Sequence, residues 1–278
     1  MQKLSPKVLA YRIKLASRHP NSHMKPEEII SEALKQKVYV AWSGGRCSTI
    51  ALHFAIQQDP DIPVVFNNTG IEYPETIKYI HYMAEKWNLN FHELKPETTF
   101  WKLVKEHGFP QLRGSSKKKR PRKPACCHYL KEAPANIFVK EHNLNGLITG
   151  LRVEENRPRA LVIFQKGPYY YAKRDNLWKF HPIALWPLDK LMDYAKLHEI
   201  PLNPLYEQGL PRIGCMPCTG FSSWREQLKM MNPTFYKWLN REVKKSEGEP
   251  TLWEYEDRYD ICLENEEVAP IMTKEDSK

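Results

Sequence analysis

The chain has 278 residues, which is enough for one large α/β domain or for two small ones. A composition of 41% hydrophobic and 27% charged residues is typical of a globular fold. The net charge of +9 favours an anionic partner such as nucleic acid, although a generally basic protein would show the same balance. No apolar run could span a membrane, and residues 1–10 lack the apolar core of a signal peptide, so we expect a cytoplasmic protein.

Hydrophobic periodicity predicts helices and strands that alternate along most of the chain. We expect strands at 38–42, 64–66, 90–94, 147–149 and 180–186. We expect helices at 7–17, 26–35, 48–57, 75–87, 134–142 and 188–197. Alternation of this kind predicts an α/β fold, a doubly wound and mostly parallel sheet covered by helices on both faces.

The predicted elements divide the chain into three parts. Residues 1–36 form amino-terminal helices, residues 37–225 form the domain that carries the candidate sites, and residues 226–278 form a helical carboxyl-terminal extension. The segment 115–124 interrupts the pattern, because it is basic and has no apolar residue other than proline. We expect this segment to be a mobile loop that can contact a polyanion.

The turn after the first strand reads Ser43-Gly44-Gly45-Arg46-Cys47-Ser48. Glycines let the backbone approach an anion closely, and the helix that follows directs free N–H groups at it. The serine hydroxyls add donors, and Arg46 adds positive charge. An ordinary strand-to-helix turn is the alternative, but the strand, turn and helix occur in the order that favours phosphate binding.

Two further loops follow predicted strands, so we expect them at the same carboxyl edge of the sheet. The first holds Asn68, Thr69, Gly70 and Glu75, which can border a nucleotide or simply begin a capped helix. The second runs from Gly150 to Arg157. It contains two arginines that can clamp phosphate, unless it is only a charged solvent-exposed loop; these are Arg152 and Arg157.

Cysteines are the third candidate site. Cys126 and Cys127 are adjacent, and Cys215 and Cys218 form a Cys-x-x-Cys pair about ninety residues later. Four soft thiolates in a reducing compartment suit zinc or an iron–sulfur cluster better than disulfides. Adjacent cysteines are unusual in zinc sites, which favours the cluster, while a buried structural pair is the alternative without metal. The cysteines left over need no metal role; these are Cys47 and Cys262.

These pieces occur together in the order of one family. The chain resembles the phosphoadenosine phosphosulfate reductase family, which has the adenine nucleotide alpha-hydrolase-like fold. The resemblance rests on residues 43–45, 68–76, 126–127, 150–157 and 203–218. It implies nucleotide binding by Ser43, Gly44, Gly45, Arg46, Ser48, Asn68, Thr69, Gly70, Glu75, Gly150 and Arg152. The cysteines are similar to those of the branch that carries a [4Fe–4S] cluster on four of them, here Cys126, Cys127, Cys215 and Cys218.

The chain also departs from the family pattern. Arg46 and Cys47 stand where family members often have Lys and Asp, and Asn68 stands where many have Asp. A Glu-Cys-Gly tail that attacks sulfur in reductases is missing, and the one late cysteine, Cys262, has no glycine after it. Relatives without that tail include ATP pyrophosphatase-type proteins of DNA phosphorothioation systems.

The resemblance therefore predicts an ATP pyrophosphatase that transfers sulfur in DNA phosphorothioate modification. It implies ATP with Mg²⁺ and a [4Fe–4S] cluster as cofactors, DNA as a partner and a cysteine desulfurase as the sulfur donor. Catalytic candidates are Arg46, Arg152 and Arg157. A sulfonucleotide reductase that uses Cys262 or Cys47 is the alternative, followed by a tRNA-thiolating enzyme and by a zinc-braced nucleic-acid binder without enzymatic activity.

Overall fold

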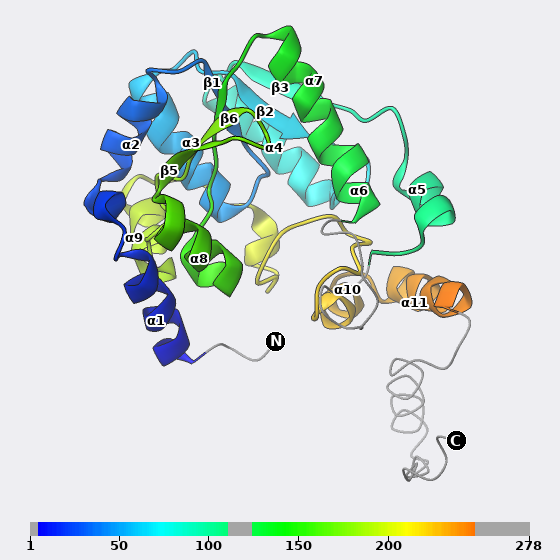
Figure 1. Ribbon diagram of the computed structural model, residues 1–278. Helices are drawn as coiled ribbons and strands as arrows, with labels where there is room; N and C mark the ends of the chain where they lie inside the picture. Colours follow the sequence, from blue (N-terminus) through cyan, green and yellow to red (C-terminus); the bar gives the residue numbers. More distant parts are fainter. Residues whose placement is uncertain (1–4, 111–123, 248–278) are drawn as a thin grey trace.

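The structure is a computed structural model that describes residues 5–110 and 124–247. Its centre is a six-stranded sheet in the order β3-β2-β1-β4-β6-β5, visible in Figure 1. Neighbouring strands are parallel except for β5, which is antiparallel to β6. The predicted mostly parallel sheet is thus confirmed. The strands are β1 (Val38–Ala41), β2 (Val64–Asn67), β3 (Phe91–Leu94), β4 (Gly146–Ile148), β5 (Tyr169–Ala172) and β6 (Leu177–Phe180).

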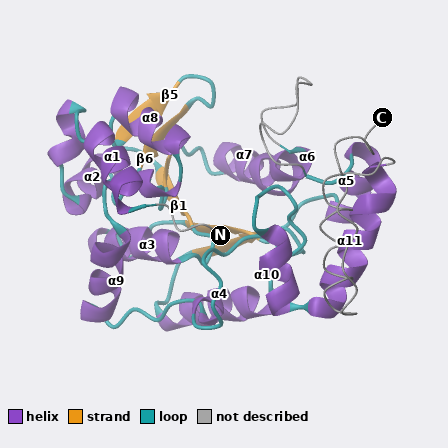
Figure 2. Cartoon of the chain, turned by 90° about the horizontal axis from the view of Figure 1, so that it is seen from below, coloured by secondary structure: helices purple, strands orange, loops and turns teal. Residues whose placement is uncertain are grey.

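Helices cover both faces of this sheet, as Figure 2 shows. Those before residue 110 are α1 (Pro6–Ala16), α2 (Pro26–Ala33), α3 (Arg46–Gln58), α4 (Pro74–Lys86) and α5 (Phe100–His107). Those after it are α6 (Ala125–Cys127), a π-helix (His128–Glu132), α7 (Ala133–Glu141), α8 (Arg157–Lys166), α9 (Leu188–Leu197), α10 (Trp224–Met231) and α11 (Pro233–Glu247). Short 3-10 helices lie at Pro20–His23, Val153–Glu155 and Pro204–Tyr206.

Successive side chains of β1 point to opposite faces and so belong to two cores. Val38 and Val40 pack with α2, α3, α4 and α9 in the larger apolar cluster. Tyr39 packs with Phe138 of α7 in a smaller cluster on the other face. This near-continuous apolar run is what a strand buried on both faces requires.

The last helices form a core of their own. Trp224 of α10 and Leu239 of α11 pack with Phe100 of α5 in a separate apolar cluster. Helices α10 and α11 therefore lie beside the sheet domain rather than on its sheet (Figure 1). Two helices thus occupy the described part of the predicted carboxyl-terminal extension.

Some elements differ from the prediction. The expected strand 180–186 was wrong, because β6 ends at Phe180 and the next residues form buried turns around Ile183. Helices α5 and α8 and strand β5 were not predicted. The predicted basic loop lies outside the described residues, apart from Pro124. In the described ranges, no helix is long and apolar enough to cross a membrane.

Candidate functional site

The glycine turn lies between the end of β1 and the start of α3. Gly44 has a φ of +69°, a left-handed conformation that favours glycine. A Cβ at Gly44 would lie 3.1 Å from Cδ1 of Ile80 and 3.3 Å from Cγ2 of Thr76, so the turn rests directly on α4. The first turn of α3 therefore lies at the carboxyl edge of the sheet, the position at which open α/β sheets bind ligands.

Side chains hold this turn in shape. The hydroxyls of Ser43 and Ser48 lie 3.1 Å apart, and the Ser48 hydroxyl donates to the carbonyl of Gly45 at 2.9 Å. The backbone N–H of Arg46 donates to the hydroxyl of Tyr206 at 3.0 Å. Ser43 is exposed and Ser48 is buried, and both can turn their hydroxyls toward a phosphate without any movement of the backbone.

Arg46 is anchored to a distant segment. Its guanidinium donates to the carbonyl of Pro211 at 3.0 Å and lies 4.7 Å from the ring centre of Tyr206. Tyr206 was not assigned a role from the sequence, although it belongs to the matched segment 203–218. The sequence signal was that motif, but only the fold shows that the hydroxyl reaches the helix start.

The loop after β4 packs against the glycine turn. A Cβ at Gly150 would lie 2.4 Å from the carbonyl carbon of Cys47 and from the backbone nitrogen of Ser48. The sheet order reverses between β1 and β4, so these loops flank the switch point where ligands bind in open α/β sheets. Both predicted loops thus lie together at this edge of the sheet.

The two arginines of this loop differ in their surroundings. Arg152 is buried, pairs with Glu154 at 3.0 Å and donates to the carbonyl of Trp186 at 2.9 Å. Its Nε is buried without a hydrogen-bond partner. Burial raises the pKa of the neighbouring Cys47 thiol, an effect that Arg152 opposes. Arg157, in contrast, is exposed at the first residue of α8.

The loop after β2 uses its polar groups to form a turn. Asn68 donates to Glu93 at 2.6 Å and accepts from the N–H of Gly70 at 2.9 Å. The N–H and the hydroxyl of buried Thr69 donate to the Glu72 carboxylate at 3.0 and 2.7 Å. Glu75 is half-buried in the first turn of α4. These contacts fix the shape of the loop after β2.

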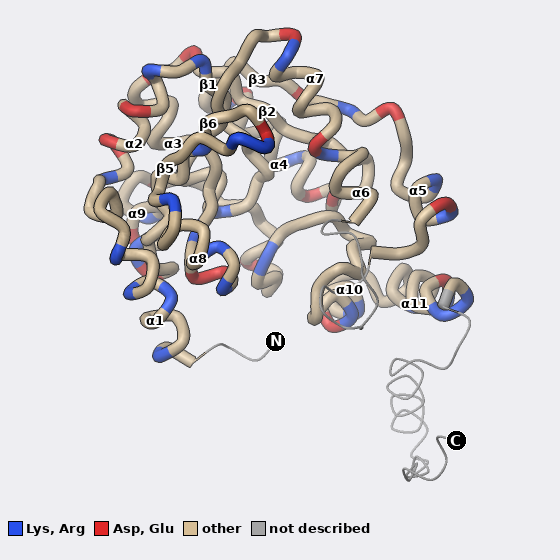
Figure 3. The backbone as a smooth tube through the Cα atoms, viewed as in Figure 1, with Lys and Arg blue, Asp and Glu red and all other residues tan. Residues whose placement is uncertain are grey.

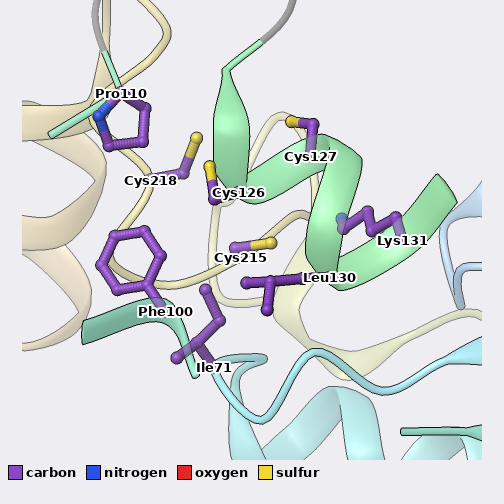
Figure 4. A pocket seen from close by; sticks show the side chains of 9 residues that line it. All are labelled: Ile71, Phe100, Pro110, Cys126, Cys127, Leu130, Lys131, Cys215 and Cys218. Atoms are coloured by element: carbon purple, nitrogen blue, oxygen red, sulfur yellow. The ribbon is translucent and has the colours of Figure 1, made fainter. Parts of the chain in front are cut away.

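The four predicted cysteines come together in one pocket, shown in Figure 4. Cys126 and Cys127 enter from α6, and Cys215 and Cys218 from the loop before α10. The other side chains that line the pocket are Ile71, Phe100, Pro110, Leu130 and Lys131. Residues nearly ninety positions apart in the sequence thus form a single cluster of sulfurs in mostly apolar surroundings.

The electrostatics of this pocket disfavour free thiolates. A hydrogen bond with Cys127 that favours the protonated thiol, burial and the other thiols all raise the pKa of Cys126. Burial raises the pKa of Cys218, whereas the hydrogen bond from the N–H of Gly220 and the charge of Arg212 oppose this rise. Several thiolates so close together repel one another, and bound cationic iron or zinc would remove that penalty.

Lys131 places a positive charge at the same pocket. Burial would lower its pKa, but Cys215 and Glu72 outweigh burial and the pKa of Lys131 is raised. The ammonium group therefore remains charged beside the sulfurs. Sequence reasoning missed this residue, although its position one helical turn after Cys127 was the available signal.

The loop after β2 and the cysteine pocket share one segment. Residues Glu72 and Cys215 form an isolated antiparallel bridge, and the N–H of Met216 donates to the carbonyl of Ile71 at 2.8 Å. The Sγ of Cys215 lies 3.8 Å from the hydroxyl of Thr69 and 3.9 Å from a carboxylate oxygen of Glu72. A ligand that moves this segment would therefore act on both sites.

The spacing of the donors bears on the metal. Within residues 5–110 and 124–247, no three His, Cys, Asp or Glu side chains are close enough to hold one metal ion. A single zinc needs all of its sulfurs about 2.3 Å from one point. A cluster is held by cysteines on different irons, so its ligands stand further apart. Soft thiolates of the kind that line this pocket are the ligands that iron–sulfur clusters use.

Comparison with known proteins gives a consistent result. The phosphoadenosine phosphosulfate reductase domain matches residues 37–221, more than half of the chain. A phosphoadenosine 5'-phosphosulfate reductase of Buchnera aphidicola is 30% identical over 203 residues, which cover 69% of this chain and 76% of that protein. An uncharacterized protein of Methanocaldococcus jannaschii is 29% identical over 75% of this chain, but the match spans only 42% of its length.

A solved structure confirms the fold. The phosphoadenylyl-sulfate reductase from Candida auris, crystallised as a phosphate complex, superposes with a TM-score of 0.55 at 18% sequence identity. The match covers 77% of this chain and 96% of that one. The expected adenine nucleotide alpha-hydrolase-like architecture is therefore present.

Proposed function

This chain belongs to the phosphoadenosine phosphosulfate reductase domain family, and from that premise we propose that it is an ATP pyrophosphatase that transfers sulfur to DNA. A non-bridging oxygen of a DNA phosphate attacks the α-phosphorus of ATP, pyrophosphate leaves, and the DNA phosphate carries AMP. The terminal sulfur of a persulfide made by a cysteine desulfurase then attacks the DNA phosphorus, and AMP leaves with that oxygen. A second thiol cleaves the remaining S–S bond, so that the phosphorothioate is released and a disulfide forms.

The preference for an ATP pyrophosphatase over a reductase rests on the surroundings of the cysteines. Reduction of a sulfonucleotide needs an accessible thiolate that attacks sulfur and leaves a covalent intermediate. In the described part of the chain, four of the five cysteines line the sulfur pocket. The fifth, Cys47, lies under Gly150 with a pKa raised by burial. Neither environment supplies an activated nucleophile, whereas the glycine turn suits nucleotide chemistry.

We assign a role to each candidate residue at this edge of the sheet. The phosphates of ATP, bound with Mg²⁺, would lie on Gly44 and Gly45 at the start of α3, with donors from Ser43 and Ser48. The nucleotide would be bordered by Asn68, Thr69, Gly70, Glu75 and Gly150. Exposed Arg157 can reach a developing negative charge. Buried Arg152 would position the loop from beneath through Glu154, and Arg46 would act from its anchor on Tyr206.

A [4Fe–4S] cluster would bind Cys126, Cys127, Cys215 and Cys218, where it supplies soft, redox-active iron. The charge of Lys131 beside Cys215 would offset part of the negative charge of the ligated thiolates. The contacts of Thr69 and Glu72 with Cys215 would fix the cysteine loop relative to the nucleotide.

Product analysis tests the proposal. Anaerobically purified protein should release pyrophosphate from ATP in the presence of DNA and a cysteine desulfurase, and DNA from producing cells should contain phosphorothioate. A protein that releases no pyrophosphate from ATP but does release sulfite from a sulfonucleotide would overturn it.

A sulfonucleotide reductase is the second candidate, favoured by the 30% identity to the reductase of Buchnera aphidicola. It would require a nucleophile outside the sulfur pocket, and Cys262, which lies outside the described residues, is the one late cysteine. The two activities separate by substrate, because one needs ATP and the other a sulfonucleotide and a reductant.

A further inference from the structure

Helices α5 and α11 meet at one end of the molecule, away from the sheet (Figure 2). Their contact exposes a pair of tryptophans. Trp101 of α5 and Trp238 of α11 pack edge to face with ring centres 5.2 Å apart. Their exposed fractions are 40% and 41%, so both rings keep a large apolar surface open to solvent. Phe235 stacks on Trp238 at 5.5 Å and extends the aromatic surface.

Basic residues share the exposed faces with these rings. Residues three and four apart lie on the same face of a helix, so Lys105 accompanies Trp101, and Arg241 accompanies Trp238. Both basic residues are exposed, as is Lys237, which directly precedes Trp238 in the sequence. Figure 3 shows both blue and red segments on these helices. Their acidic residues are fewer than their basic ones, but Glu242, four residues after Trp238, shares the face of Trp238 and pairs with Lys245 at 2.9 Å.

We propose that this aromatic and basic face, formed by α5 and α11, binds single-stranded nucleic acid. Bases stack on exposed aromatic rings without sequence preference, and lysine and arginine contact the phosphates between them. A rigid duplex hides the faces of its bases, so stacking of this kind requires a single strand. The flanking positive charge favours a polyanion over an apolar protein partner.

The location of the face links it to the site. Phe100 lines the sulfur pocket, and the next residue, Trp101, is exposed on the same helix, about 100° further around its axis. The inference rests on the proposed function, in which nucleic acid accepts sulfur, and it names the surface and the strand state that are recognised.

Binding of a fluorescein-labelled oligothymidylate to the full-length protein, followed by fluorescence anisotropy without ATP, tests the inference. Trp101→Ala with Trp238→Ala should weaken binding roughly tenfold or more, because each stacked base contributes substantially. Trp101→Phe with Trp238→Phe keeps two aromatic faces and should retain most of the affinity. Tyr171→Ala, an equally exposed aromatic on β5 at the far edge of the sheet, is the matched control.

The salt dependence of oligothymidylate binding gives a second readout, which leaves the tryptophans of this face unchanged. Lys105→Gln with Arg241→Gln should reduce the log–log salt slope by about 1.4, since each phosphate contact on a single strand contributes about 0.7. Lys173→Gln with Arg174→Gln, in the turn between β5 and β6, should leave the slope unchanged.

Unchanged affinity in both tryptophan variants would overturn the inference. Duplex DNA that binds as tightly as oligothymidylate and responds equally to the tryptophan substitutions would also overturn it. So would a self-association that the alanine variant abolishes while oligothymidylate binding is retained. Pyrophosphate release is measured separately. Tryptophan-dependent binding without release would refute the proposed function alone, and release without such binding would refute this inference alone.

Discussion

Gly150 lies against the backbone of Cys47 so closely that a Cβ would come within 2.5 Å of the Cys47 carbonyl oxygen. The loop after β4 and the glycine turn after β1 are therefore in direct backbone contact across the switch point of the sheet. That contact sets the relative position of the two loops on which we place the nucleotide.

Gly150→Ala should displace the glycine turn, because the clash is with backbone rather than with a flexible side chain. We expect the free energy of unfolding to fall by about 1–3 kcal/mol, as for other overpacked sites, and ATP affinity to fall with it. Calorimetry and urea unfolding measure the two effects. Gly108→Ala is the control, because its φ of +74° is strained for alanine but no atom lies within 4 Å of the new Cβ.

That control should lose stability without losing ATP affinity. If Gly150→Ala binds ATP as tightly as the wild type, the close contact does not shape the nucleotide site.

Tyr206→Phe should leave the N–H of Arg46 without its acceptor at 3.0 Å while keeping the ring under the guanidinium. An unsatisfied N–H of this kind costs about 1–3 kcal/mol, so the free energy of unfolding should fall by about that amount. A bound phosphate can replace the hydroxyl as acceptor, so ATP affinity should be undiminished. Weaker ATP binding by this variant in calorimetry would show that the hydroxyl itself contacts the nucleotide.

Cys126→Ser and Cys218→Ser should abolish iron binding, because each removes one of four ligands. Anaerobic wild-type protein should contain about four irons and four sulfides per chain by chemical analysis. Cys47→Ser is the matched control and should retain the iron, because Cys47 lies under the nucleotide loop. One tightly held zinc and no iron would contradict the cluster.

Cys262→Ser should leave pyrophosphate release nearly intact if the enzyme uses ATP, because no step then needs that thiol. Its acidic neighbours disfavour a thiolate, whereas an activated nucleophile needs a nearby positive charge. The readout is pyrophosphate release together with sulfite release from a sulfonucleotide. Loss of sulfite-producing turnover in this variant would establish the reductase instead.

His181 should make stability depend on pH. Burial, followed by the charges of Lys179 and Arg159, lowers its pKa to about 3. The unfolded chain therefore binds a proton first as the pH falls, and stability present above about pH 6.5 is lost below it. Between about pH 7.5 and 5.5 this histidine alone should remove roughly 1 kcal/mol from the free energy of unfolding.

Urea unfolding of His181→Gln should show a smaller loss over the same pH range, while exposed His23→Gln should match the wild type. Equal pH dependence in His181→Gln and the wild type would mean that His181 is not held neutral in the folded protein.

The sequence by itself was sufficient for the first four strands and for α3, α4 and α7 among the helices between them. Their signals are local: apolar runs such as 38–42 and 64–66, and helical periodicity in 48–57 and 75–87. It also identified the glycine turn and both cysteine pairs, because their chemistry depends on residue type and short spacing. The segment 180–186 misled this reasoning, since apolar content reports burial and does not distinguish a strand from buried turns.

Only the tertiary structure decided which distant groups meet. The sheet order brings Gly150 onto Cys47. The bridge between Glu72 and Cys215 joins the loop after β2 to the sulfur pocket. Helix packing turned Trp101 and Trp238 toward each other across one exposed face. The physical reason is common to all three cases: composition and periodicity are properties of neighbouring residues, whereas contacts across more than a hundred positions depend on how whole elements pack.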